Sequence, residues 1–193
     1  MTTPPLILAS QSPRRKVILE SLGLTFSIQP AHVDETPLRA EAPLAYVRRV
    51  ARAKAVALAG QNPGHVVVAA DTPIICRRRI IQSPATRKEA HAMLRAQSNR
   101  RVHIPTAVCV VDARGKVHEA VSQNWVKLRQ LTDAEIEAYL ANDANWKGIA
   151  GALQIEHPVC QTWIPTVHGS HSGILGLPVY ETVKLLKRAG ITC

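Results

Sequence analysis

A short apolar run followed by a basic helix start constrains this chain more than any other feature. Residues 6–8 are apolar and strand-like, and small or hydroxylated residues such as Ser10 follow them before Pro13 opens a helix. Proline is favoured at the first helical position because its missing N–H needs no partner there. Residues 14–16 place three cations in the first turn, although the helix macrodipole already makes that end electropositive. The pattern predicts that an anion is held at this helix start.

The chemistry of that turn favours a phosphate as the anion. The free N–H groups of a helix start, the Ser10 hydroxyl and the guanidinium groups of Arg14 and Arg15 are phosphate ligands, and Lys16 adds charge. A solvated basic helix start is the alternative, and these residues alone leave it open.

The net charge of +10 implies an anionic partner, which could be a nucleotide, a nucleic acid or an acidic surface. The densest basic runs outside the first helix are Arg77–Arg79 and Arg100–Arg101, which we interpret as solvated turns. No aromatic residue is interleaved with these runs, which argues against a platform that stacks single strands. Nucleic acid is therefore not expected as the main partner.

Composition is that of a globular chain, with 46% apolar and 20% charged residues. No run is long enough to span a membrane, and the first residues lack the pattern of a signal peptide, so no membrane partner is expected. The cysteines Cys76, Cys109, Cys160 and Cys193 are scattered without metal-site spacing, which is typical of reduced thiols and predicts a cytoplasmic protein.

Hydrophobic periodicity predicts alternating strands and helices interrupted by a hairpin, and hence a mixed α/β sheet. The second helix should bury Leu44, Val47, Ala51 and Leu58, with Lys54 and three arginines elsewhere. Thr132 and Glu135 form a capping box. The expected strands are 25–28, 65–70, 108–111, 116–128 and 162–167, the expected helices are 13–22, 43–60, 86–96, 133–140 and 178–189, and 146–153 is an expected loop.

Three acidic residues are candidates for chemistry. Asp71 ends a buried strand, where α/β folds place catalytic groups, although a strand-end Asp that caps a turn is the more common case. Asp34 and Glu35 are either turn formers or, together with Asp71, ligands of a divalent ion, because Mg²⁺ uses one or two carboxylates plus substrate phosphates.

Four segments, read in order, resemble the Maf family of nucleotide pyrophosphatases. They are LILASQSPRRKVILESLG, VDETP, VVVAADT and GSHSGILGLPVYET, and the likeness runs from Leu6 to Gly190. The resemblance implies one domain over residues 1–193, with an inosine-triphosphatase-like fold: an elongated mixed sheet flanked by helices, in two lobes about a cleft. It also implies hydrolysis of a nucleoside triphosphate to the monophosphate and pyrophosphate with a divalent cation, Mg²⁺ or Mn²⁺. The A-D-T form at Asp71 resembles the branch that acts on dTTP and UTP.

Family roles carry over to individual residues. Ser10, Arg14 and Arg15 would bind phosphates and Lys16 would add charge, while Glu156 stands at a substrate-binding glutamine of the family. Glu35 would help to hold the metal, and Asp71 would orient or deprotonate water or bind the ion. A homodimer is an option by likeness only.

The chain departs from the family pattern at positions that matter for catalysis. Ser83 and Ile149 stand where the family carries lysines, and Glu156 where it carries glutamine. Because the loss of one transition-state donor commonly costs about 10²–10³ in rate, these changes suggest a weakened activity. A catalytically silent relative that binds nucleotide or a partner protein is the alternative.

Overall fold

The computed structural model describes residues 3–192, and contacts between residues group the chain into two compact units, each described by itself. Unit 1 takes in Met1–Thr72, Pro105–Ser122 and Ser170–Cys193, and unit 2 takes in Pro73–Ile104 and Gln123–Gly169. Both units combine one five-stranded sheet with helices, so the predicted mixed α/β fold is confirmed, with its strands divided between two sheets. The prediction of a single two-lobed domain around a cleft stays a prediction.

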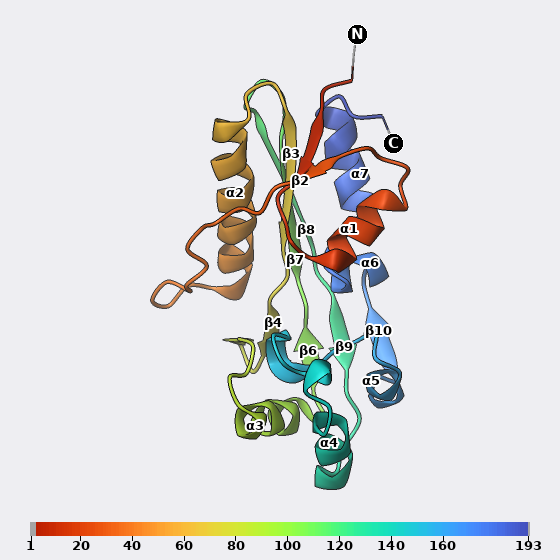
Figure 1. The fold of residues 1–193 in the computed structure, drawn as a ribbon. Helices are drawn as coiled ribbons and strands as arrows, with labels where there is room; N and C mark the ends of the chain where they lie inside the picture. Colours follow the sequence, from red (N-terminus) through yellow and green to blue (C-terminus); the bar gives the residue numbers. More distant parts are fainter. Residues whose placement is uncertain (1–2, 193) are drawn as a thin grey trace. The chain divides into compact units, whose positions relative to one another are not determined.

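Unit 1 is a sheet with helices on both faces. Its strands are β1 (Leu6–Leu8), β2 (Ser27–Ile28), β3 (Val66–Asp71), β7 (Thr106–Val111) and β8 (Val117–Ser122). Its helices are α1 (Pro13–Glu20), α2 (Pro43–Gln61), α6 (His171–Ile174) and α7 (Val179–Arg188). The strand order is β2-β1-β3-β7-β8, in which β2, β1 and β3 are parallel and β7 and β8 antiparallel. Helix α2 covers one face, and α1 and α7 lie on the other (Figure 1).

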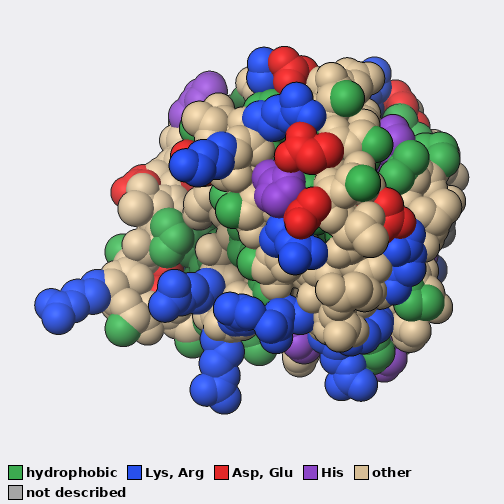
Figure 2. Space-filling view, turned by 90° about the horizontal axis from the view of Figure 1, so that it is seen from below, with side chains coloured by type: hydrophobic (Ala, Val, Ile, Leu, Met, Phe, Trp, Pro, Cys, Tyr) green, Lys and Arg blue, Asp and Glu red, His purple; other side chains and the backbone are tan. Residues whose placement is uncertain are grey.

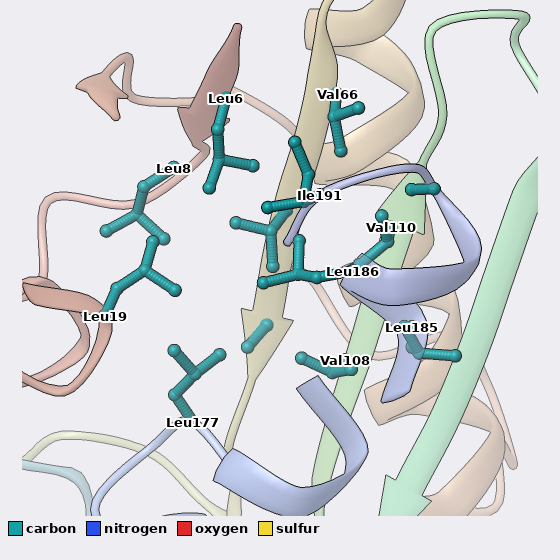
Figure 3. Close-up of a cluster of buried hydrophobic side chains, with 13 residues drawn as sticks. Leu6, Leu8, Leu19, Val66, Val108, Val110, Leu177, Leu185, Leu186 and Ile191 are labelled. Carbon is teal, nitrogen blue, oxygen red and sulfur yellow. The ribbon is translucent and has the colours of Figure 1, made fainter. Parts of the chain in front are cut away.

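The core of unit 1 explains why these strands have no polar face. Val66, Val68 and Ala70 of β3 point into one cluster with Val108 and Val110 of β7 (Figure 3). Residues from β1, α1, α7 and the segments that flank α7 complete this cluster: Leu6, Leu8, Leu19, Leu177, Leu185, Leu186, Ala189 and Ile191. The alternate residues of β3, such as Val67 and Ala69, are equally buried, because α2 covers the other face. A strand buried on both faces reads as a continuous apolar run, and its first polar residue marks its end.

Unit 2 is built on an antiparallel sheet. Its strands are β4 (Ile74–Cys76), β5 (Arg79–Ile81), β6 (Arg101–His103), β9 (Trp125–Lys127) and β10 (Thr166–His168), in the order β10-β9-β6-β4-β5. Its helices are α3 (Arg87–Gln97), α4 (Asp133–Leu140), α5 (Pro158–Trp163) and two short 3-10 helices, η1 (Asp143–Asn145) and η2 (Ala150–Ala152). Helix α4 begins at the predicted capping box, which Thr132 and Glu135 complete.

Most of the predicted elements are confirmed within a residue or two, and the exceptions have local causes. The single strand expected over 116–128 is wrong: β8 ends at Ser122, and β9 begins at Trp125 in the other sheet. The strand expected over 162–167 is also wrong in its first half, because Pro158 opens helix α5 and β10 begins only at Thr166. The loop expected over 146–153 contains the short helix η2.

Two burial predictions for α2 are wrong as well. Lys54, which was placed away from the apolar face, is only 8% exposed, whereas Leu44 is 41% exposed. Of the cysteines, Cys76, Cys109 and Cys160 are free and buried, and Cys193 lies outside the described residues. Among the residues that the structure describes, no helix is long and apolar enough to cross a membrane.

Candidate functional site

The turn between β1 and α1 is organised around two serine hydroxyls. Ser12 is the N-cap of α1, and its hydroxyl accepts a hydrogen bond from the backbone N–H of Arg15 at 3.5 Å. Ser10 is buried just after β1, and its hydroxyl oxygen accepts from the Ser12 N–H at 3.1 Å and from Arg15 Nη1 at 3.2 Å. The small residues after the strand therefore position the guanidinium group of the first helical turn.

Arg15 is fixed on its other side by the loop before α7. Its Nε donates to the carbonyl oxygen of Gly176 at 2.9 Å, and its Nη2 donates to Thr72 Oγ1 at 3.4 Å. Gly176 has a φ of +113°, and a Cβ there would lie 3.3 Å from Arg15 Nε, so only glycine allows this close approach. Burial lowers the pKa of Arg15, and the negative charges of Asp71 and Glu35 oppose that effect.

A pair of threonine hydroxyls supports Arg15 from behind. Thr106 Oγ1 lies 3.0 Å from Thr72 Oγ1 and 2.6 Å from the carbonyl oxygen of Gly173. A hydroxyl has one proton and a carbonyl only accepts, so Thr106 donates to Gly173 and Thr72 donates to Thr106. The lone pairs of Thr72 are then left to accept from Arg15, which orders the whole chain of hydrogen bonds.

A buried lysine joins two carboxylates beside this arginine. Lys54 Nζ, from the middle of α2, donates to Glu35 Oε2 at 2.8 Å and to Asp71 Oδ1 at 3.1 Å. Lys54 and Asp71 are only 8% and 7% exposed, whereas about half of the Glu35 side chain, 49%, is exposed. The lysine therefore forms one ion pair in the interior of unit 1 and one at its surface.

Burial dominates the electrostatics of Asp71. It raises the pKa of this carboxyl above the ordinary value, although the charges of Lys54 and Arg15 lower it, and the neighbouring Glu35 raises it further. A carboxylate that is partly destabilised in this way is a better base than an exposed one, because a raised pKa brings its proton affinity closer to neutral pH.

These groups border one cavity of about 250 Å³ in unit 1. Its lining is more polar than apolar and includes Ser10, Arg15, Glu35 and Lys54, together with Ala9, Gln11, Pro30, Ala31 and His32. Asp71 lies behind Lys54, with which it shares a hydrogen bond. The cavity thus combines a fixed guanidinium group and a hydroxyl with an ammonium group held between two carboxylates.

The structure brings some of the predicted site residues together and leaves others apart. Ser10 and Arg15 are joined by a hydrogen bond, and Glu35 and Asp71 share Lys54. Arg14 and Lys16 lie on the exposed side of α1, where Lys16 pairs with Glu20. Glu156 belongs to unit 2, just before α5, so its predicted role toward the substrate stays a prediction.

Sequence reasoning missed Lys54, although a signal for it exists. Val47, Val50, Ala51 and Leu58 of α2 are buried, and position 54 falls on the same stripe at helical spacing. A lysine within an apolar stripe must find a carboxylate when the helix packs, because an unpaired buried charge is costly. The strand-end Asp71 was the available partner.

The paired carboxylates are compatible with a divalent cation. The described residues contain no group of three or more His, Cys, Asp or Glu side chains that could hold a metal ion alone. However, Glu35 and Asp71 already share one cation, the Lys54 ammonium group. Because Mg²⁺ is commonly held by one or two carboxylates plus substrate phosphates, this donor set fits an ion that arrives with a phosphate ligand.

Fold and cavity together define a mixed α/β protein with a polar cavity in which a fixed guanidinium group lies beside paired carboxylates. The chain belongs to the Maf family, because the family profile described as Maf-like protein matches residues 5–189. It is 44% identical over 190 residues to the dTTP/UTP pyrophosphatase of Cereibacter sphaeroides, covering 96% of this chain and 95% of the relative. It is 40% identical over 189 residues to the dTTP/UTP pyrophosphatase of Sphingopyxis alaskensis, covering 97% and 98%.

Among solved structures, the chain matches a nucleoside-triphosphatase, dITP/XTP pyrophosphatase, from Mycobacterium abscessus. The match has a TM-score of 0.42 and 16% identity, and it covers 66% of this chain and 75% of the other.

Proposed function

We propose that this protein hydrolyses a nucleoside triphosphate, with dTTP and UTP as the first candidates, to the monophosphate and pyrophosphate. The observation that carries this proposal is the position of Lys54, which is held between Glu35 and Asp71 in a cavity that also contains Arg15. The curated relatives named above are dTTP/UTP pyrophosphatases, which supports the same substrates.

Arg15 and Ser10 would bind the phosphate chain. The guanidinium group is held by Gly176 and Ser10 before any substrate arrives, so little side-chain freedom is lost on binding. Displacement at phosphorus depends on positioning and on neutralising charge more than on covalent help, and a preorganised arginine supplies both. Arg14 and Lys16, on the exposed side of the same helix, would raise the local concentration of anionic substrate.

Asp71 would accept a proton from the attacking water. Its raised pKa favours this role, and the Lys54 ammonium group keeps the carboxylate ionised and oriented through the 3.1 Å hydrogen bond. Glu35, which is half exposed, would contact a divalent cation, Mg²⁺ or Mn²⁺, together with Asp71. Such a cation supplies charge neutralisation on the phosphates and lowers the pKa of a bound water molecule.

The proposal is tested by measuring the release of pyrophosphate from dTTP and UTP. Wild type, Asp71→Asn and Asp143→Asn are compared in parallel, each with Mg²⁺ and with Mn²⁺. Asp143→Asn is the matched control, because it removes the same charge from an exposed side chain of unit 2. We expect Asp71→Asn to lose at least about 10²-fold in kcat, as general bases commonly contribute that much, while the control stays near wild type.

Two results contradict the proposal. In the first, the wild-type protein releases no more pyrophosphate than Asp71→Asn does from a panel of common and modified nucleotides. That result would contradict the proposed hydrolysis. Calorimetric binding of nucleotide without turnover would instead identify a catalytically silent member of the family.

A further inference from the structure

The exposed face of the unit 2 sheet carries an aromatic stack. In β9, Trp125 is paired with His103 of β6 on one side and with His168 of β10 on the other. The rings of Trp125 and His168 stack with centroids 5.0 Å apart and an angle of 7°. The guanidinium carbon of Arg101 lies 4.6 Å from the Trp125 ring centroid. The sequence offered no aromatic residue among the basic runs, but the sheet register places one against Arg101.

The next row of the same face is cationic. Arg101 is paired with Lys127, two residues along from Trp125 on the same strand. Antiparallel pairing of Ile75 with His103 brings the β4–β5 turn to this end of the sheet as well. Arg77 is in that turn, directly after Cys76 at the end of β4.

The β4–β5 turn presents its charges in an uncommon backbone conformation. Arg77 and Arg78 both have positive φ, 51° and 63°, in a turn that usually selects asparagine and glycine. Such backbone conformations recur at functional sites. Arg77 directly follows β4, and Arg100 directly precedes β6, at the strand ends that the antiparallel pair of Ile75 with His103 brings to one side of the sheet. The strand ends of β4 and β6 therefore present several guanidinium groups together.

Counter-charges lie elsewhere in unit 2. The unit has eleven Lys and Arg and six Asp and Glu residues, a net charge of +5. Asp133, Glu135 and Glu137 belong to α4, where they pair with arginines outside the aromatic face. Among the described residues, no carboxylate lies within salt-bridge distance of Arg77, Arg101 or Lys127. In the space-filling view, Lys and Arg predominate in the lower part and Asp and Glu lie mainly in the upper part (Figure 2).

A polar cavity continues this surface. It has a volume of about 320 Å³ and is lined by Arg95, Ser98, Asn99, Arg100 and Gln130. Lys127 Nζ donates to the backbone oxygen of Asn99 at 2.7 Å, so the cavity begins where the cationic row ends. Rings for stacking, a row of cations and a polar cavity thus follow one another on one unit, and of the two arginines in that cavity Arg95 is paired with Asp133.

We propose that this face of unit 2 binds single-stranded nucleic acid. Bases would stack on the exposed rings of His168 and His103, which Trp125 lies between, while the phosphates follow Arg101 and Lys127 toward the Asn99 cavity. Stacking tolerates any base because every base has a π-face, and a basic groove that follows the backbone supplies the rest of the affinity. This face shares no residue with the lining of the unit 1 cavity, so the proposal rests on other side chains than the hydrolytic activity does.

Fluorescence anisotropy with a short labelled oligothymidylate tests the proposal, on the full chain and over a series of salt concentrations. We expect Trp125→Ala to weaken binding about tenfold, since stacking on an aromatic ring contributes about 1–3 kcal/mol per base. Lys127→Gln should reduce the slope of log K against log salt by about 0.7, the value for one phosphate contact on a single strand. Lys88→Gln is the matched control, because it removes the same charge from an exposed side chain of α3 in the same unit.

Tryptophan fluorescence gives a second readout, which distinguishes a loss of binding from a misfolded variant. Trp146 and Trp163 are only 2% and 1% exposed, so quenching of tryptophan fluorescence by the oligonucleotide should come from Trp125. Trp125→Phe keeps a ring and should retain most of the affinity while the quenching disappears. An excess of inorganic pyrophosphate at constant ionic strength should leave binding intact, which separates this face from the unit 1 cavity.

Four outcomes overturn the proposal. They are absence of binding at low salt, an equal loss of affinity in Lys88→Gln, duplex DNA bound as tightly as the single strand, and displacement of the oligonucleotide by pyrophosphate. The last would place the polynucleotide at the unit 1 cavity.

Discussion

Substitution of the two partners of the buried Lys54–Asp71 ion pair should change stability in opposite directions. Lys54→Met leaves the buried carboxylate of Asp71 without the ammonium group that compensates it. Asp71→Asn removes the buried negative charge, keeps an oxygen that accepts from Lys54, and leaves the lysine paired with Glu35. We expect the first variant to be less stable than wild type at pH 7 and the second to be more stable.

The burial of the pair sets the expected magnitude for Lys54→Met. Loss of one partner from a buried ion pair costs about 3–5 kcal/mol, and the half-exposed Glu35 makes the lower end of that range appropriate here. With a urea dependence of about 2 kcal/mol/M for a chain of this size, a loss of about 3 kcal/mol lowers the unfolding midpoint by about 1.5 M. The loss should shrink in acid, because Asp71 can then take up a proton and need no partner.

The sign for Asp71→Asn follows from the raised pKa of the carboxyl. In the folded protein Asp71 holds its proton to higher pH than in the unfolded chain, where the pKa is near 3.8. Its contribution to stability is therefore fully present below that value and is lost as the pH rises through the folded pKa. Because asparagine never ionises, the variant should exceed wild type in stability at pH 7, and the difference should vanish toward pH 3.8.

The assay must report on unit 1. All three tryptophans, Trp125, Trp146 and Trp163, belong to unit 2, so their fluorescence would miss the event. Urea unfolding followed by far-ultraviolet circular dichroism, with amide hydrogen exchange of β3 as the local readout, measures the relevant transition. The reasoning is refuted if Lys54→Met is as stable as wild type at pH 7, or if Asp71→Asn loses as much as Lys54→Met does.

Three further predictions concern the surroundings of the site. Thr106→Val should weaken binding of pyrophosphate, measured by calorimetry, because Arg15 loses its ordered support, whereas Thr106→Ser restores it; equal affinity of all three proteins would contradict this. Gly176→Ala should lower the melting temperature more than Gly190→Ala does, since both require positive φ but only the former crowds another side chain; equal losses would disprove the crowding. The carboxyl group of Glu135 accepts hydrogen bonds from Arg129, so its pKa, measured by NMR titration, should be lowered to about 2. An ordinary value of 4.5 would contradict that ion pair.

Local chemistry made much of the fold predictable. The helix at Pro13, the capping box at Thr132 and the apolar run that ends at Asp71 each depend on neighbours within a few residues. Strands of three residues, such as β4 and β6, are too short to show an alternation of apolar and polar residues, so hydrophobic periodicity does not distinguish them from the turns around them. Three polar residues, Ser122, Gln123 and Asn124, mark the point where the chain crosses from one sheet to the other, and the prediction of one strand over 116–128 overlooks this signal.

The candidate site shows the same dependence on range. Ser10 and Arg15 are five positions apart and were predicted together, and their hydrogen bond spans a single turn. The prediction for Lys54 is wrong because a lysine is rarely buried unless it is paired, and its partner cannot be seen from the helix alone. Its burial is explained only by Asp71, which comes from a strand that packs against α2.

Trp125 illustrates this limit at the second surface. In the sequence it is far from Arg101, and judged by neighbours along the chain the basic runs contain no aromatic residue. Antiparallel pairing of β6 with β9 reverses that conclusion, because register rather than sequence distance decides which side chains meet on a sheet. A stacking surface formed in this way can be recognised only once the strand order is known. For that reason the oligonucleotide experiment tests the register of β9 as directly as it tests the proposed partner. If β9 were shifted by one residue, Trp125 would point to the buried face of the sheet. The oligonucleotide would then not quench Trp125, and Trp125→Ala would not lose affinity.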